Sequence, residues 1–117
     1  MSFNKYATLK RRLRQRRDAI DMQTSIITKP SDFRDWMSKC KSIFALDTEC
    51  TSLNWLDLEI IGFSIADGTQ ACYVDIKRKY KKELLQILDF YISEAKMIVM
   101  HNAPFDCMVL LKEGIEI

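Results

Sequence analysis

Four short apolar runs along this chain have the length and composition of strands buried in a sheet. They cover residues 43–47, 59–66, 70–76 and 97–100. The dipeptide Asp67-Gly68, which is typical of tight hairpin turns, separates the second run from the third. We therefore expect the two middle strands to pair as an antiparallel hairpin. Residues 24–29 add a further short strand or an extended lead-in.

Apolar positions at helical spacing occur between and after these strands. Residues 80–94 repeat apolar side chains around one broad helical face. Residues 104–113 form another predicted helix, for which Gly114 is a natural stop. Because a helix crosses over to it, the strand at 97–100 is expected to run parallel to the strand at 43–47. The pattern predicts an α/β fold with a mixed sheet flanked by helices.

A third helix is predicted over residues 32–40. Ser31 is its expected N-cap, because a serine hydroxyl accepts hydrogen bonds from the free backbone N–H groups of a first turn. Phe33, Trp36 and Met37 fall on one side of this helix and are expected to face the core.

The first 23 residues differ from the rest in charge and pattern. Residues 5–22 have a thin apolar stripe at helical spacing, formed by Tyr6, Leu9, Leu13 and Ile20. Residues 1–30 carry eight Lys or Arg and two Asp, a net +6, whereas residues 31–117 carry ten basic and fourteen acidic residues, a net −4. We expect a basic N-terminal arm or helix over 1–23, which suits a partner with phosphates. A surface helix, a docking element and a solvated face without a partner remain alternatives.

Composition restricts the class of protein further. A chain of 117 residues with 48% hydrophobic and 29% charged residues suits one small domain. No apolar stretch approaches the roughly 20 residues that cross a bilayer, and no signal peptide is apparent. The four Cys form no Cys-x-x-Cys pair and accompany a single His. This argues against zinc and predicts free thiols in a reducing cytoplasm.

Acidic residues follow two of the predicted core strands. Asp47 and Glu49 stand two residues apart at the end of the first strand, so their side chains are expected on the same face. Asp106 follows the strand at 97–100. If both strands belong to one sheet, three carboxylates meet where the strands end. Such a group needs a cation, and hard oxygen ligands suit Mg²⁺ or Mn²⁺.

The residues around Asp106 have simpler interpretations as well. Asp106 falls in the first turn of its helix, where the dipole stabilises a negative charge. Asn102 precedes it by one turn and is expected to cap the helix or to position a phosphate. His101 is interpreted as a structural hydrogen-bonding residue. Taken alone, each acidic motif is also compatible with an ordinary surface acid or a salt-bridge partner.

Two longer segments carry a family resemblance. Residues 44–53, Phe-Ala-Leu-Asp-Thr-Glu-Cys-Thr-Ser-Leu, with Ile61-Gly62-Phe63-Ser64, resemble the first exonuclease motif of the proofreading domains of family A DNA polymerases. Residues 101–106, His-Asn-Ala-Pro-Phe-Asp, resemble their second motif. The resemblance covers roughly residues 24–117. It implies a ribonuclease H-like fold, in the DEDD exonuclease superfamily, that removes nucleotides from the 3′ end of DNA with two divalent metal ions.

The resemblance also implies roles for single residues. Asp47, Glu49 and Asp106 are then the catalytic metal ligands for Mg²⁺ or Mn²⁺, with Asp47 bridging both ions. The expected substrate-binding residues are Thr48, Leu53, Asn102 and Phe105. Leu53 resembles the residue that wedges against the terminal bases, although an ordinary loop residue is the alternative. Phe105 is expected to support the site by packing, which a core residue does in any case.

One family motif has no counterpart in residues 1–117. The third motif, a Tyr or His followed four residues later by Asp, belongs on a helix beyond the second motif. We therefore expect a C-terminally incomplete, ribonuclease H-like domain over residues 24–117, in a bacterial or phage-type cytoplasm. The chain alone is expected to be nearly inert. Its expected partners are a single-stranded 3′ end of DNA and a polymerase chain or second copy that completes the domain.

Two alternatives remain from the sequence. The first is a catalytically idle fragment that binds DNA or a polymerase chain, and the second is an RNA-processing nuclease of the same superfamily. Nuclease activity with Mn²⁺ separates the idle fragment from an enzyme. A matched pair of ribose and deoxyribose substrates separates an RNA nuclease from a DNA nuclease.

Overall fold

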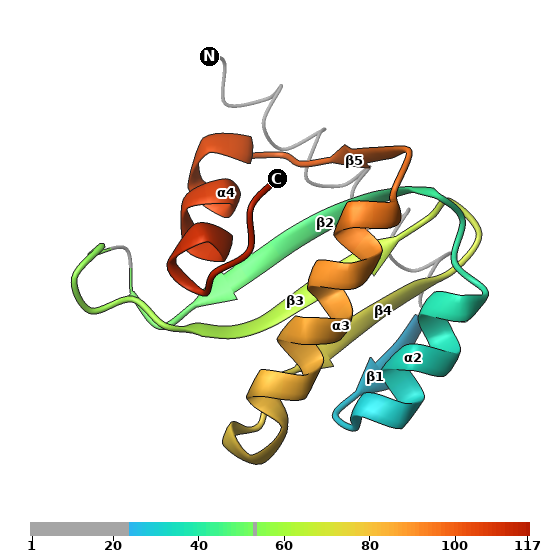
Figure 1. The fold of residues 1–117 in the computed structure, drawn as a ribbon, viewed down its shortest axis with the longest axis horizontal. Coiled ribbons are helices and arrows are strands. Elements are labelled where there is room, and N and C mark those ends of the chain that lie inside the picture. Colours follow the sequence, from blue (N-terminus) through green and yellow to red (C-terminus); the bar gives the residue numbers. More distant parts are fainter. Residues whose placement is uncertain (1–23, 53) are drawn as a thin grey trace, which may run out of the picture.

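A computed structural model of the chain describes residues 24–52 and 54–117, and its centre is a five-stranded mixed sheet (Figure 1). The strands are β1 (Thr24–Ile27), β2 (Ile43–Cys50), β3 (Ile60–Ala66), β4 (Ala71–Asp75) and β5 (Met97–Val99). Their order across the sheet is β1-β4-β3-β2-β5. The β2–β3 and β3–β4 pairs are antiparallel, and β5 runs parallel to β2. The predicted α/β fold with a mixed sheet is confirmed.

Within residues 24–52 and 54–117, three helices pack on one face of this sheet (Figure 1). They are α2 (Pro30–Ser38), α3 (Lys81–Glu94), which follows a short 3₁₀ turn η1 (Arg78–Tyr80), and α4 (Ala103–Lys112). The predicted Ser31 cap is wrong, because Pro30 opens α2 and Lys29 is the N-cap. Proline favours the first helical position, where its fixed φ suits the helix and its missing N–H costs nothing. No described helix has the length and apolar composition needed to cross a membrane.

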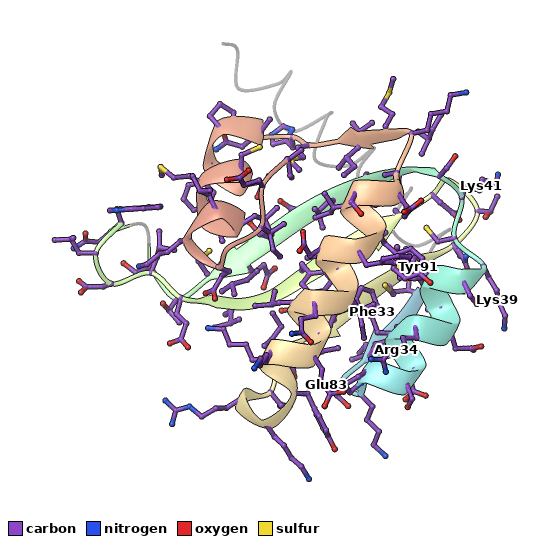
Figure 2. The ribbon with its side chains drawn as sticks, in the orientation of Figure 1. Phe33, Arg34, Lys39, Lys41, Glu83 and Tyr91 are labelled. Atoms are coloured by element: carbon purple, nitrogen blue, oxygen red, sulfur yellow. The ribbon has the colours of Figure 1, made fainter. Side chains whose placement is uncertain are left out.

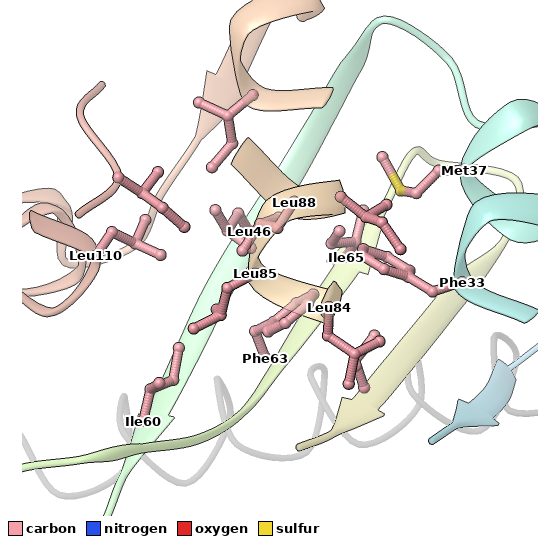
Figure 3. Close-up of a cluster of buried hydrophobic side chains, with 14 of the residues drawn as sticks. Phe33, Met37, Leu46, Ile60, Phe63, Ile65, Leu84, Leu85, Leu88 and Leu110 are labelled. Atoms are coloured by element: carbon pink, nitrogen blue, oxygen red, sulfur yellow. The ribbon is translucent and has the colours of Figure 1, made fainter. Parts of the chain in front are cut away.

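The core lies between the helices and the inner face of the sheet (Figure 3). Alternate residues of β2 and β3 point into it, including Leu46 and Phe63. Phe33 of α2 meets Phe63 edge-to-face, with ring centroids 5.4 Å apart. Figure 2 shows Phe33 of α2 and Tyr91 of α3 in the space between these two helices. As predicted, Phe33, Trp36 and Met37 are all buried.

The opposite face of the sheet, here called the open face, bears the other alternate residues. In β2 the exposed positions are Ile43, Ala45, Asp47 and Glu49. Ile26 of β1 is 78% exposed and Val99 of β5 is 52% exposed. Among the described residues, this face is not covered by a helix.

Two glycines end elements as the sequence predicted. Gly68, with φ of +93°, occupies the β3–β4 turn, where Asp67 N donates to Gln70 O at 3.2 Å. Gly114, with φ of +85°, follows the end of α4, and Ile115 N donates back to Leu110 O at 2.9 Å. Both positions lie in the left-handed region that favours glycine. The arm or helix predicted over residues 1–23 and the residue Leu53 lie outside the described residues.

Candidate active site

Asp47 and Glu49 lie in the C-terminal half of β2 and point toward the open face. The strand continues to Cys50, three residues beyond the predicted end at Asp47. Asp47 is paired in register with Ser64 of β3, and Glu49 is paired with Gly62. Both carboxylates are therefore exposed and accessible to a ligand on that face.

Thr48, between the two acids, points to the other face and contacts Asp106. Its backbone N donates to Asp106 Oδ1 at 3.2 Å, and its hydroxyl donates to the same oxygen at 2.5 Å. The pairing of β5 with β2 ends at the Ala45–Val99 pair. Beyond that pair, β2 has no further partner in β5. The backbone N–H of Thr48 donates to the Asp106 carboxylate there. Thr48 was expected to bind the substrate. In the structure it is 7% exposed, and its hydroxyl donates a hydrogen bond to Asp106.

Asp106 is a buried carboxyl group with one oxygen still lacking a partner. The residue is 1% exposed, and Oδ2 makes no hydrogen bond to any described residue. Buried polar oxygens are almost always paired in proteins. An unpaired carboxylate oxygen is a hard oxygen ligand of the kind that Mg²⁺ and Mn²⁺ bind, so the chemistry of the Asp106 side chain suits the divalent ion that the sequence implies.

The electrostatics connect Asp47 with the neighbouring acids. Partial burial and then the charges of Asp106 and Glu49 raise the pKa of Asp47, while His101 lowers it. These charges act through space only when the groups are near one another. His101 itself is exposed at the start of the loop into α4. The interpretation of His101 as a structural hydrogen-bonding residue stays a prediction.

The three acids are nevertheless not drawn into one ligand shell. Within residues 24–52 and 54–117, no group of three His, Cys, Asp or Glu side chains is arranged to hold a metal ion. Asp47 and Glu49 face the open side, whereas Asp106 faces Thr48. The assignment of all three as metal ligands stays a prediction.

The remaining predicted residues lie around α4. Asn102 is the N-cap of α4, but its side chain makes no capping hydrogen bond, and its backbone O accepts from Asp106 N at 3.0 Å. Asn102 is exposed, so its amide is available to a ligand. Phe105 is half-buried and packs against the core, as its packing role requires. Asp106 lies in the first turn of α4, as predicted.

One contact of Glu49 was not anticipated from the sequence. The Tyr73 hydroxyl of β4 donates to Glu49 Oε2 at 3.2 Å. Burial and then the Glu49 charge raise the pKa of Tyr73. The available signal was Gly62, because a glycine inside a strand often marks a close approach of another group.

The sequence is similar to an exonuclease family and to two DNA polymerases. Residues 24–117 match the family model described as 3′-5′ exonuclease. Over 78 residues, the chain is 40% identical to DNA polymerase DpoZ of Vibrio phage phiVC8, covering 64% of this chain and 12% of that protein. Over 102 residues, it is 28% identical to DNA polymerase I of Chloroflexus aurantiacus, covering 80% and 11%. The chain thus spans about an eighth or less of these relatives' length.

Solved structures share the fold at low sequence identity. The Nibbler EXO domain of Aedes aegypti superposes with a TM-score of 0.63 at 10% identity, covering 78% of this chain and 44% of that one. The catalytic core of RRP6 from Trypanosoma brucei gives 0.59 at 19% identity, covering 76% and 25%. The expected ribonuclease H-like architecture is confirmed, and the chain covers less than half of either solved structure.

Proposed function

Because the chain belongs to the 3′-5′ exonuclease family, we propose that it supplies Asp47, Glu49 and Asp106 to a site that removes nucleotides from the 3′ end of single-stranded DNA. The observation that carries the proposal is the arrangement around β2. Two accessible carboxylates flank Thr48, and Thr48 holds a buried third carboxylate whose Oδ2 is unpaired. A structural salt-bridge cluster would instead pair these acids with Lys or Arg, and the described ion pairs all involve other carboxylates.

The resemblance of the sequence motifs to proofreading exonucleases implies divalent metal ions, and the acids around β2 would suit Mg²⁺ or Mn²⁺ by their oxygen chemistry. Asp47, Glu49 and Asp106 are the residues that would hold these ions. Such ions stabilise charge on the attacking and leaving oxygens of phosphodiester hydrolysis. The chain's own contribution is to orient the acids. Thr48 holds Asp106 against β2, and the strand register fixes the spacing of Asp47 and Glu49.

DNA is the proposed substrate because both curated relatives are named as DNA polymerases. A polymerase chain, or a second copy of this chain, is the proposed protein partner. We propose residues 24–117 as the exonuclease-type domain and residues 1–23 as a basic arm that contacts phosphates. The match to the family model over residues 24–117 supports this division.

The test uses the chain in excess over a 5′-labelled oligonucleotide, with Mn²⁺, on DNA and RNA of one sequence. We expect slow stepwise shortening of DNA from its 3′ end, which Asp47→Ala abolishes. An oligonucleotide blocked at its 3′ terminus is the control for direction. Equal shortening by Asp47→Ala, or internal cleavage, would refute the proposal. Faster shortening of the RNA than of the DNA would show that RNA is the preferred substrate.

An idle, DNA-binding chain is the second candidate. It is favoured by the separation of Asp106 from the other two acids across the faces of β2, which leaves no three-residue ligand group among the described residues. Salt-sensitive DNA binding without any Mn²⁺-dependent shortening would select this candidate, because phosphate contacts weaken steeply with salt.

A further inference from the structure

Tyr73 of β4 reaches Glu49 of β2 across the strand that lies between them. The register pairs Tyr73 with Ser64 and pairs Glu49 with Gly62. The two residues are therefore two strands apart and in different rows of the sheet. Two strand spacings amount to roughly 10 Å of sheet surface. A tyrosine side chain is long enough to span much of this distance, and its hydroxyl lies 3.2 Å from Glu49 Oε2.

Gly62 leaves the room for this reach. A Cβ at that position would lie 2.1 Å from Tyr73 Oη, 2.6 Å from Tyr73 Cζ and 3.0 Å from Val74 O. The backbone conformation does not demand glycine here, because positive φ among the described residues occurs at Gly68 and Gly114. The missing side chain at Gly62 therefore serves the passage of the Tyr73 ring over β3.

We propose that Tyr73 is a positioning residue for Glu49, and that its hydroxyl fixes the carboxylate in the orientation that binds a divalent ion beside Asp47. This inference rests on the proposed function. Glu49 is an exposed side chain with several rotatable bonds, so holding it in place costs conformational entropy. A hydrogen bond formed before the ion arrives removes part of that cost from binding.

Matched variants separate the hydroxyl from the fold. Tyr73→Phe keeps the ring over Gly62 and removes only the donor. Gly62→Ala forces the ring to move away and removes the same hydrogen bond by another route. Tyr91→Phe is the control, because it removes a phenol from α3, on the other face of the sheet. Urea unfolding of each variant shows whether the fold is retained.

The experiment is a calorimetric titration of the full chain and each variant with Mn²⁺ alone. We expect Tyr73→Phe and Gly62→Ala to weaken Mn²⁺ binding about two- to tenfold, the range that one net hydrogen bond supplies. Tyr91→Phe should bind as the unaltered chain does. The chain with both Tyr73→Phe and Gly62→Ala should bind Mn²⁺ no more weakly than the more affected of the two single variants. The reason is that both substitutions remove the same hydrogen bond.

Two further variants distinguish failure of this inference from failure of the proposed function. Asp47→Ala should abolish binding and Glu49→Gln should weaken it strongly. Unchanged affinity in Tyr73→Phe, with loss in Asp47→Ala, overturns the role of Tyr73 and leaves the proposed function intact. Unchanged affinity in Asp47→Ala, with weakening in both Tyr73→Phe and Glu49→Gln, supports Tyr73 and overturns the assignment of Asp47. Absence of Mn²⁺ binding by the unaltered chain overturns both.

Discussion

Replacing Thr48 with valine removes one oxygen from the contact between the two buried polar residues of the described part of the chain. The hydroxyl donates to Asp106 Oδ1 at 2.5 Å, and Asp106 is 1% exposed. A hydrogen bond to a charged group contributes about 1.5–3 kcal/mol, and a buried acceptor that loses its donor keeps its desolvation cost. Valine has nearly the shape of threonine and suits a strand, which offsets a few tenths of a kcal/mol. We expect Thr48→Val to lower the free energy of unfolding by about 1–2.5 kcal/mol.

The assay is urea unfolding in EDTA at neutral pH, followed by tryptophan fluorescence, to which the buried Trp36 (8% exposed) and the more exposed Trp55 (42%) both contribute. With a slope of about 1–3 kcal/mol per molar urea, the midpoint should fall by roughly 1 M. Thr48→Ser is the matched control, because it keeps the hydroxyl and loses only a methyl group.

A double-mutant cycle with Asp106→Ala isolates the contact. Once Asp106 is absent, Thr48→Val should cost less than about 0.5 kcal/mol, since the hydroxyl has lost its acceptor. An equal cost in both backgrounds, or a fully stable Thr48→Val chain, would refute the view that Thr48 holds Asp106 in place.

Three further predictions concern stability and association. Asp67 accepts hydrogen bonds from Thr69 N, Gln70 N and Lys41 N, which outweigh partial burial and lower its pKa well below the usual range. Its stabilisation is complete above the ordinary Asp pKa of about 4 and declines as pH falls below it, so the stability difference between the unaltered chain and Asp67→Ala should shrink from pH 7 to pH 3 in urea unfolding. Gly114→Ala should cost about 1–2 kcal/mol in thermal unfolding because alanine is strained at φ of +85°; no loss would show that the end of α4 adapts. The apolar residues of the open face should cause self-association that Ile26→Lys reduces, whereas a monomer at high concentration by light scattering would contradict this.

Local patterns account for the parts of the fold that the sequence predicted. Alternation in β2 and β3, the Asp67-Gly68 turn and Gly114 after α4 each depend on a few neighbouring residues. The start of α2 at Pro30 was missed because the preference of proline for the first helical position outweighed the capping preference of Ser31. The strand β2 extends beyond its apolar run to Cys50. Asp47 and Glu49 can be part of it because they point toward the open face, where a charged side chain keeps its contact with water.

The candidate site required information that no local pattern carries. The motif residues 47–49 and 106 were singled out because each follows an apolar run, and their role as a site stays a prediction. The contact of Asp106 with Thr48 depends on where β5 ends against β2. The contact of Tyr73 with Glu49 depends on the register of three strands at once. Such geometry follows from tertiary packing, so sequence spacing alone could not reveal it.

The central claim is that the acids around β2 form a divalent-ion site, and paramagnetic broadening tests it most directly. Mn²⁺ titrated at substoichiometric amounts into the ¹⁵N-labelled chain should first broaden the amide signals around Asp47, Glu49 and Asp106. The same titration of Asp47→Ala should leave those signals sharp. Broadening centred on another acidic cluster, or equal broadening around β2 in Asp47→Ala, would contradict the claim.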